Sequence, residues 1–346
     1  MLWHETPTRT KTPRTGGSAP AAVFSGGSLL YGSVGRTDLE DPDRTAELTR
    51  AQYRSARRLA ELLDDDAGVY PTHGFGSFCS SGSSSGGEDS TIGQERARND
   101  ALTEDDEDAF VDRLVAGLTA YPSYYAHMGA LNRHGAGPID LSAPEPVDGE
   151  QLRKRIAAGE WAVDLRNRVA YAAEHLGGSV GIELGGQFAT YLGWVIPWDT
   201  PITLIGEDAR QVTDAQRQLV RIGIDRPAGA AVGTPAELAD GDSRTYPRAT
   251  FAELAERANA AANGFIVLDV RRDDERATGE LPGSVHIPLN SLLDRLDEIP
   301  DSQLWVHCAS GFRASIAASL LDRAGHDVVL VDDDYITAVD NGWATG

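Results

Sequence analysis

Residues 304–325 read LWVHCASGFRASIAASLLDRAG, an apolar run that reaches Cys308 and then continues into an alanine-rich segment. The run up to Val306 predicts a buried strand, and the segment that extends to about Arg323 predicts a helix. Open parallel sheets bind their ligands at the carboxyl ends of the strands, which is where this turn places Cys308. The stretch therefore predicts an α/β fold whose strand-to-helix turn carries the chemistry.

The turn itself has the pattern Cys-x-x-Gly-x-Arg. Its backbone N–H groups lie beside a helix start and can form a cradle for an anion. The same positive field favours the nucleophilic thiolate of Cys308. Gly311 lets the turn curl tightly, and Arg313 can hydrogen-bond an anion or lock the loop. A buried structural cysteine is the alternative, but this pattern favours a nucleophile. The candidate catalytic residues are Cys308 and Arg313, and the candidate substrate-binding residues are Ala309, Ser310, Gly311 and Phe312.

The second half of the chain repeats itself. WAVDLRNR (161–168) and GSVGIEL (178–184) in one copy correspond to IVLDVRRD (266–273) and GSVHIPL (283–289) in the other. One constant offset relates Asp164, Arg166, Gly178, Ser179, Val180, Ile182 and Leu184 to Asp269, Arg271, Gly283, Ser284, Val285, Ile287 and Leu289. Strands alternate with helices in both copies, which predicts duplicated domains with parallel sheets over 145–235 and 246–346. Asp269 and Arg271 end a neighbouring strand and either brace the loop or serve as structural charges.

The second copy resembles the rhodanese family of sulfurtransferases. LDVR (268–271), PGSVHIPL (282–289) and VHCASGFR (306–313) stand in the family's order. The resemblance implies that Cys308 carries the transferred sulfur as a persulfide, and that the substrates are a small anionic sulfur donor and a thiol or cyanide acceptor. It implies no cofactor for this reaction. Dual-specificity phosphatases share the fold, but their loop has one residue more between cysteine and arginine, so the shorter loop here favours sulfur transfer.

The chain departs from the family in three places. GELPG (279–283) lacks the histidine of the usual Gly-His-Ile-Pro-Gly, and DDDY (332–335) replaces the usual Gly-Gly-x-x-x-Trp. In the first copy the loop region, IGEDARQVTDA (205–215), has no cysteine. The first copy therefore cannot carry a persulfide, and we expect it to be a structural or docking half.

Residues 1–140 begin with a predicted short buried strand at 21–27, followed by a helical pattern at about 43–63. The acidic run 104–108 predicts the start of a helix that reaches about Tyr121. FSGGSLLYGSVGRTDL (24–39), VYPTHGFGSFCS (69–80), STIGQER (90–96) and YPSYYAHMGALNR (121–133) resemble the C-terminal half of a metallo-β-lactamase-fold hydrolase. The subgroup is the persulfide-dioxygenase and glyoxalase-II-like one, which is often fused to two rhodanese copies. The resemblance implies an N-terminally truncated domain whose missing half would leave apolar sheet surface exposed.

A metal site in this block has few candidates. His73, in PTHG (71–74), is the candidate ligand, whereas zinc or iron needs three or four ligands. The family's His-x-His-x-Asp-His motif belongs to the half that is absent; Arg9 stands in place of a second ligand histidine, and Gly27 in place of a ligand aspartate. Zinc or iron is thus expected only if the site survives. A metal-dependent hydrolase or persulfide dioxygenase is the alternative function, and a non-enzymatic sulfur-relay module is a third.

The composition restricts the partners and the compartment. The 346 residues include 31 Lys+Arg and 53 Asp+Glu, a net charge of −22, and Lys11 and Lys154 are the two lysines. Such a charge repels phosphate, so neither nucleic acid nor an anionic membrane is expected as a partner. An acidic, lysine-poor surface suits a salt-rich, halophilic cytoplasm. The two cysteines, Cys79 and Cys308, exclude a disulfide scaffold and fit a reducing cytoplasm. The sequence leaves a homodimer open.

Overall fold

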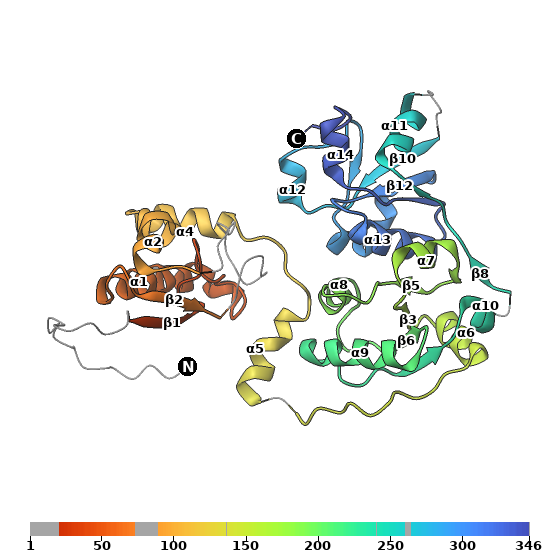
Figure 1. Ribbon diagram of the computed structural model, residues 1–346, viewed down its shortest axis with the longest axis horizontal. Helices are drawn as coiled ribbons and strands as arrows, with labels where there is room; N and C mark the ends of the chain where they lie inside the picture. Colours follow the sequence, from red (N-terminus) through yellow and green to blue (C-terminus); the bar gives the residue numbers. More distant parts are fainter. Residues whose placement is uncertain (1–20, 73–88, 136, 240, 260–263, 346) are drawn as a thin grey trace. The chain divides into compact units, whose positions relative to one another are not determined.

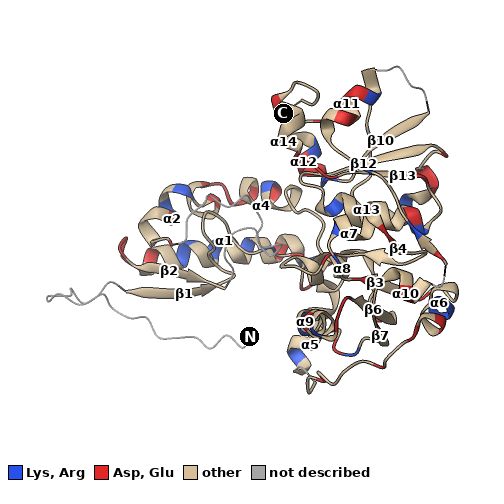
Figure 2. Ribbon diagram, turned by 45° about the vertical axis from the view of Figure 1, so that its right-hand side comes forward, with Lys and Arg blue, Asp and Glu red and all other residues tan. Residues whose placement is uncertain are grey.

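The computed structural model describes residues 21–72, 89–135, 137–239, 241–259 and 264–345. The chain divides into two compact units, Met1–Leu118 and Thr119–Gly346 (Figure 1). Among the described residues, no helix is both long and apolar enough to cross a membrane. Acidic residues and arginines are distributed over the helices and loops of both units (Figure 2).

The first unit is a two-stranded parallel sheet covered by helices. Its elements are β1 (Ala22–Gly26), η1 (Pro42–Arg44), α1 (Thr45–Leu62), β2 (Gly68–Pro71), α2 (Ile92–Arg98), α3 (Asp100–Thr103) and α4 (Glu107–Ala116). One face of α1 buries Tyr53, Ala56 and Ala60 against the core. The predicted helix start is confirmed, since Asp106 caps α4, but the helix ends at Ala116 rather than near residue 121.

The prediction of a buried strand at 21–27 is wrong in one respect. The strand is present, but Phe24 is 86% exposed and contacts the ring of Tyr70, which is 53% exposed and lies on β2. The reason is that the helical core buries the opposite face of this small sheet, through residues such as Val69. An exposed apolar sheet face is what the resemblance to half of a larger domain implies.

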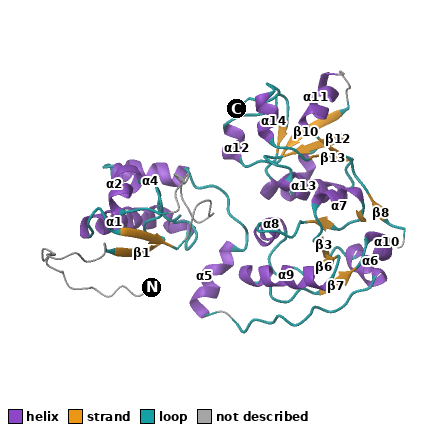
Figure 3. Cartoon of the chain, in the orientation of Figure 1, coloured by secondary structure: helices purple, strands orange, loops and turns teal. Residues whose placement is uncertain are grey.

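The second unit contains two parallel sheets (Figure 3). The first copy follows α5 (Tyr125–His134) and comprises α6 (Gly149–Ala157), β3 (Trp161–Asp164), α7 (Arg168–Ala173), β4 (His175–Leu176), β5 (Val180–Gly181), α8 (Phe188–Val195), β6 (Ile202–Gly206), α9 (Ala209–Leu219), η2 (Val220–Ile222), β7 (Gly229–Val232) and α10 (Pro235–Ala239). Its sheet has the order β5-β3-β6-β7. Strand β4 instead pairs with β8 (Ser243–Arg244), which is antiparallel to it.

The second copy has a five-stranded sheet of order β11-β10-β12-β13-β9. Its elements are β9 (Arg248–Ala249), α11 (Phe251–Asn259), β10 (Phe265–Asp269), α12 (Asp273–Ala277), β11 (Val285–His286), η3 (Leu289–Ser291), η4 (Leu293–Glu298), β12 (Gln303–His307), α13 (Phe312–Arg323), β13 (Val328–Val331) and α14 (Tyr335–Asp340). The strand, turn and helix expected over 304–323 are confirmed.

The repeat in the sequence is also a repeat in the backbone. Asp164 lies opposite Gly181 and Ile205, and Asp269 lies opposite His286 and His307 in the same parallel register. The N–H groups of Ile182 and Ile287 donate to the carbonyl oxygens of Asp164 and Asp269 over 3.0 and 3.1 Å. The two copies therefore have one fold, as expected of a duplication.

Helix α13 joins the two copies. Its side chains from Ala314 to Leu321 are all buried, and it packs on β12 and β13 of its own sheet and on β5 of the first copy. Alanine is the best helix former, and its small side chain allows close packing on more than one side. The two copies therefore share one hydrophobic core, to which Val180 contributes from the first and Val306 from the second.

Candidate active site

Cys308 stands between the end of β12 at His307 and the start of α13 at Phe312. The side chains of this loop differ in exposure: Cys308 is 1% exposed, Ala309 and Phe312 are half-buried, and Ser310 is exposed. Because so little of the Cys308 side chain is exposed, we expect only a small reagent to reach its sulfur.

Gly311 has the backbone conformation that the tight turn demands. Its φ is +82° and its ψ is −26°, in the left-handed region that favours glycine. A Cβ at this position would lie 2.2 Å from Oδ1 of Asp332, so a side chain has no room. The predicted role of Gly311 in curling the loop agrees with this geometry.

The backbone of the loop presents donors at the start of α13. No side chain caps this helix, and in the described part of the chain the N–H groups of Ser310, Gly311 and Phe312 have no hydrogen-bond partner. The loop is fixed from behind, because the Tyr335 N–H donates to the Ala309 carbonyl over 2.8 Å and the Ser315 N–H donates to the Gly311 carbonyl over 2.8 Å. Together with the helix dipole, these donors can receive an anion.

Arg313 is held by a carboxylate that the sequence analysis did not single out. Both terminal nitrogens of its guanidinium donate to Glu275 on α12, with Nη2 at 2.8 Å from Oε1. Burial alone would lower the pKa of Arg313, but the bond to Glu275 and the electrostatic interaction with Cys308 raise this pKa above its ordinary value. Burial raises the pKa of Glu275, but the bond to Arg313 lowers it by more. The net result is a pKa of Glu275 below its usual range. Of the two roles expected for Arg313, the structure contains the locking contact.

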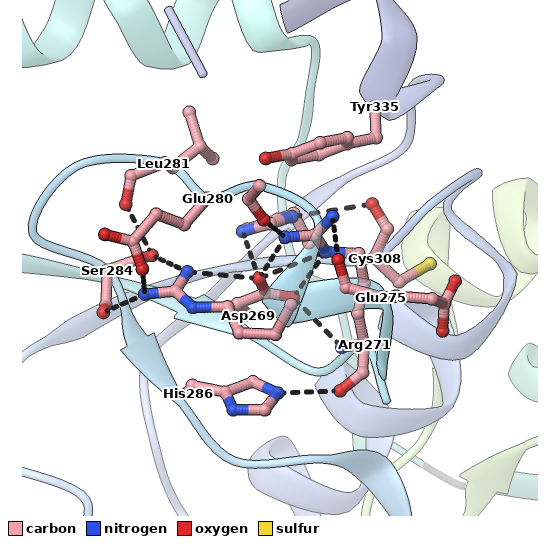
Figure 4. A network of polar contacts seen from close by, with 12 residues as sticks. Asp269, Arg271, Glu275, Glu280, Leu281, Ser284, His286, Cys308 and Tyr335 are labelled. Atoms are coloured by element: carbon pink, nitrogen blue, oxygen red, sulfur yellow. Dashed lines mark hydrogen bonds and ion pairs between the residues drawn. The ribbon is translucent and has the colours of Figure 1, made fainter. Parts of the chain in front are cut away.

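Asp269 and Arg271 form a buried ion pair below the loop (Figure 4). Nε and Nη2 of Arg271 donate to the carboxylate of Asp269 over 3.0 and 2.7 Å. The guanidinium also lies over the ring of Tyr335, 3.8 Å from its centroid. Since Tyr335 bonds the loop at Ala309, this arrangement links the ion pair to the loop. Tyr335, in the stretch that departs from the family pattern, thus contacts both Ala309 of the loop and Arg271.

His307 is fully buried next to Cys308. Its ring stacks with Tyr335, 5.8 Å between centroids, and meets Phe251 edge-on. Burial is the main reason why the pKa of His307 falls to about 4; the Asp269 charge opposes the fall and the Arg271 charge adds to it. The imidazole is therefore neutral at physiological pH and packs as an aromatic group.

The first copy keeps the ion pair but lacks the reactive loop. Asp164 and Arg166 repeat the contacts of Asp269 and Arg271, with Nη2 at 2.6 Å from Oδ2. The register places Gly206 where the second copy has Cys308. Asp208 caps α9 by accepting from the Gln211 N–H over 2.8 Å, so a side chain of the protein already occupies this helix start. That the first copy carries no persulfide stays a prediction from its missing cysteine.

A side chain of the first copy reaches the loop of the second. Tyr191, on α8, meets Phe312 edge-on with 5.3 Å between ring centroids. Burial raises the pKa of Tyr191, while the charges of Arg313 and Arg272 oppose this. No sequence pattern marked Tyr191 or Glu275 as site residues. Their contacts with Phe312 and Arg313 arise from tertiary packing, which local sequence patterns do not encode.

The described residues provide no set of metal ligands that fits the metallo-β-lactamase resemblance. Among the described residues there is no group of three or more His, Cys, Asp and Glu side chains that could hold a metal ion. His73, the predicted ligand, lies outside the described residues, as does Cys79. We therefore derive no chemical step through a metal.

Comparisons with known proteins place the chain in a family. The model of the rhodanese-like domain matches residues 250–336. A sulfurtransferase of Allochromatium vinosum is 31% identical over 72 residues, which are 20% of this chain and 67% of that protein. YtwF of Bacillus subtilis is 30% identical over 82 residues, which are 23% of this chain and 79% of that protein.

The fold, the loop and these relatives define a rhodanese-like protein with α/β architecture. The chain belongs to the rhodanese-like family, through its C-terminal copy. It also resembles a metallo-beta-lactamase of Staphylococcus aureus, with a TM-score of 0.52 and 28% identity over 63% of this chain and 59% of that one. The predicted fold, a partial metallo-β-lactamase likeness followed by rhodanese-like domains, is confirmed. Other curated relatives, from Bacillus subtilis and Mycobacterium tuberculosis, are covered over only 35% and 39% of their length.

Proposed function

We propose that the chain is a sulfurtransferase that passes sulfane sulfur through a persulfide on Cys308. The observation that carries this proposal is the position of Cys308, at a strand end and beside the unpartnered N–H groups at the start of α13. The thiolate is the form of cysteine that attacks sulfur.

The reaction consists of two displacements at sulfur. In the first, the Cys308 thiolate attacks the outer sulfur of thiosulfate or a polysulfide; the new S–S bond forms as the old one breaks, and sulfite or the shortened polysulfide leaves with the electron pair. In the second, a thiolate or cyanide attacks the outer sulfur of the persulfide, and Cys308 leaves as thiolate. The product is an acceptor persulfide or thiocyanate. Electrons balance without a cofactor, as in ordinary covalent catalysis.

The charges around the loop have separate roles in this scheme. The N–H groups of Ser310, Gly311 and Phe312 receive the donor anion at the helix start. Arg313 attracts the donor anion with its positive charge, for which the donor competes with Glu275. Asp269 and Arg271 hold the loop through Tyr335. The 1% exposure of Cys308 favours a small donor.

The test is sulfur transfer from thiosulfate to cyanide by the full chain, compared with Cys308→Ser. Thiocyanate formation is expected to be lost in Cys308→Ser and kept in Cys79→Ser, the matched control. Full activity in Cys308→Ser would overturn the proposal. We further propose that the reaction takes place in the cytoplasm and that nucleic acids and membranes are not partners, in keeping with the charge of −22.

The likeness to the Staphylococcus aureus protein supports a second candidate, a metal-dependent hydrolase or dioxygenase. Its test is the metal content of the purified full chain. Stoichiometric zinc or iron that His73→Ala removes would support this candidate, and protein without stoichiometric metal after growth with both metals would contradict it.

A further inference from the structure

We propose that Arg168 of the first copy is a positioning residue for the Cys308 loop, which acts by neutralising Asp332, the carboxylate directly behind Gly311. The kinetic part of this inference rests on the proposed function. It gives the copy without a cysteine a role in the reaction of the other copy.

Asp332 is a buried carboxylate with two cationic partners. It follows β13, and its side chain is 8% exposed. Nε of Arg168, at the start of α7, lies 2.6 Å from Oδ1, and Nη1 of Arg248, on β9, lies 2.9 Å from Oδ2. Arg168 is itself oriented by Glu183 of the first copy, whose carboxylate lies 3.2 Å from Nη1. The first copy therefore provides one cationic partner of Asp332, Arg168, and the second copy provides the other, Arg248.

The same carboxylate touches the reactive loop. Its Oδ1 is the atom that an added Cβ on Gly311 would meet at 2.2 Å, so Asp332 packs against the turn without an intervening side chain. The segment that begins at Asp332 also contains Tyr335, whose N–H donates to Ala309. Arg168 thus holds, from the other copy, the segment on which the loop rests.

The charge of Asp332 has a consequence for an anionic donor. A negative charge behind the cradle opposes the binding of an anion at the loop N–H groups unless it is neutralised. Asp332 belongs to DDDY (332–335), the stretch in which this chain departs from the usual family pattern, so the need to offset this charge comes from its own sequence. Arg168 and Arg248 together offset the charge of Asp332. Without Arg168, the buried carboxylate would keep only Arg248 as a cationic partner.

A set of variants of the full chain separates this charge effect from loosening of the contact between the copies. Arg168→Gln removes the cation, Asp332→Asn removes the anion, and the double variant removes both. Arg244→Gln is the control, because Arg244 lies 3.6 Å from Asp322 at the opposite end of α13 and away from the loop.

Arg168→Gln is expected to raise the KM for thiosulfate about 5-fold and to change kcat by less than about 2-fold, since one charge near the donor is left uncompensated. Asp332→Asn added to Arg168→Gln should restore the KM, Arg168→Lys should keep it low, and Arg244→Gln should not change it. Equal effects of Arg168→Gln and Arg244→Gln, or a raised KM that persists in the double variant, would overturn the inference.

A second readout does not depend on sulfur transfer. The rates at which anionic iodoacetate and neutral iodoacetamide alkylate Cys308, followed on the Cys308 peptide by mass spectrometry, give a ratio that reports the local charge. The ratio is expected to fall about 5-fold in Arg168→Gln and to recover in the double variant. If Arg168→Gln fails to fold, Asp332→Asn decides alone, because its ratio should exceed that of the wild type. If the ratio in Arg168→Gln equals that of the wild type, the inference is contradicted, even if the wild type forms thiocyanate. If the ratio changes but the wild type forms no thiocyanate, only the proposed function is contradicted.

Discussion

Glu275→Gln tests how the positive charge of the loop is made available to the sulfur donor. In the structure, both terminal nitrogens of Arg313 bond to the Glu275 carboxylate, and the two side chains are 11% and 23% exposed. A donor anion that uses Arg313 must compete with this carboxylate. Glutamine has nearly the same shape and keeps one acceptor, so the substitution removes charge while it leaves the packing largely intact.

The size of the effect follows from the strength of the contact. Hydrogen bonds to charged groups contribute about 1.5–3 kcal/mol, and solvent screening at this partly exposed pair reduces that to about 1 kcal/mol. Since every 1.4 kcal/mol is tenfold, the KM for thiosulfate should fall about 5-fold in Glu275→Gln. Stability should fall by about 1 kcal/mol, because the charged bond between Glu275 and Arg313 is replaced by a neutral one.

The assay is steady-state thiocyanate formation over a range of thiosulfate concentrations, with urea unfolding in parallel. Glu280→Gln is the matched control: Glu280 pairs with Arg276 at 2.6 Å and, among the described residues, makes no hydrogen bond or ion pair with Arg313. A KM that rises or stays constant in folded Glu275→Gln would refute the reasoning and would mean that Glu275 orients Arg313 rather than competing for it.

Three further predictions concern the fold around the site. Gly311→Ala should lower the free energy of unfolding by more than about 2 kcal/mol and abolish sulfur transfer, because φ is +82° and a Cβ would lie 2.2 Å from Asp332; urea unfolding that matches the wild type would contradict this. His307 has a folded pKa of about 4, so the unfolded chain binds the proton first as the pH falls below about 6.5, and stability should drop by up to about 3 kcal/mol between pH 6.5 and 4. His307→Phe should make that pH profile flatter, and an equally steep profile would exclude this source. The net charge of −22 predicts that Tm rises as KCl increases from low to molar concentration, because salt screens self-repulsion; a Tm independent of KCl would argue against a salt-adapted surface.

The part of the fold that the sequence predicts best is the repeated α/β unit. An apolar strand ending in Cys308 and an alanine-rich helix after it are local signals, and they appear as β12 and α13. The constant offset between Asp164 and Asp269 is a second strong signal, and both aspartates adopt the same register. Burial was harder to predict: Phe24 lies in an apolar run typical of a buried strand, yet it is exposed, since burial depends on what covers the sheet.

The partners of the site charges could not be predicted from the sequence. Residues 305–321 around Arg313 contain no acidic residue, and only packing brings Glu275 of α12 to it. Asp332 appeared as a departure from a family pattern, whereas the structure gives it two arginines, one of them in the other copy. Such long-range pairs leave no periodicity in the sequence, because they join segments whose separation along the chain is arbitrary. The predicted boundaries at residues 140 and 235 stay predictions.

The most direct measurement is the intact mass of the full chain after incubation with thiosulfate and removal of small molecules. Our account predicts a gain of one sulfur atom, located on the Cys308 peptide, that disappears on addition of cyanide with release of one thiocyanate. It predicts no gain in Cys308→Ser. A sulfur that stays on the protein in Cys308→Ser, or a wild-type chain that gains none while it is folded, would contradict the account.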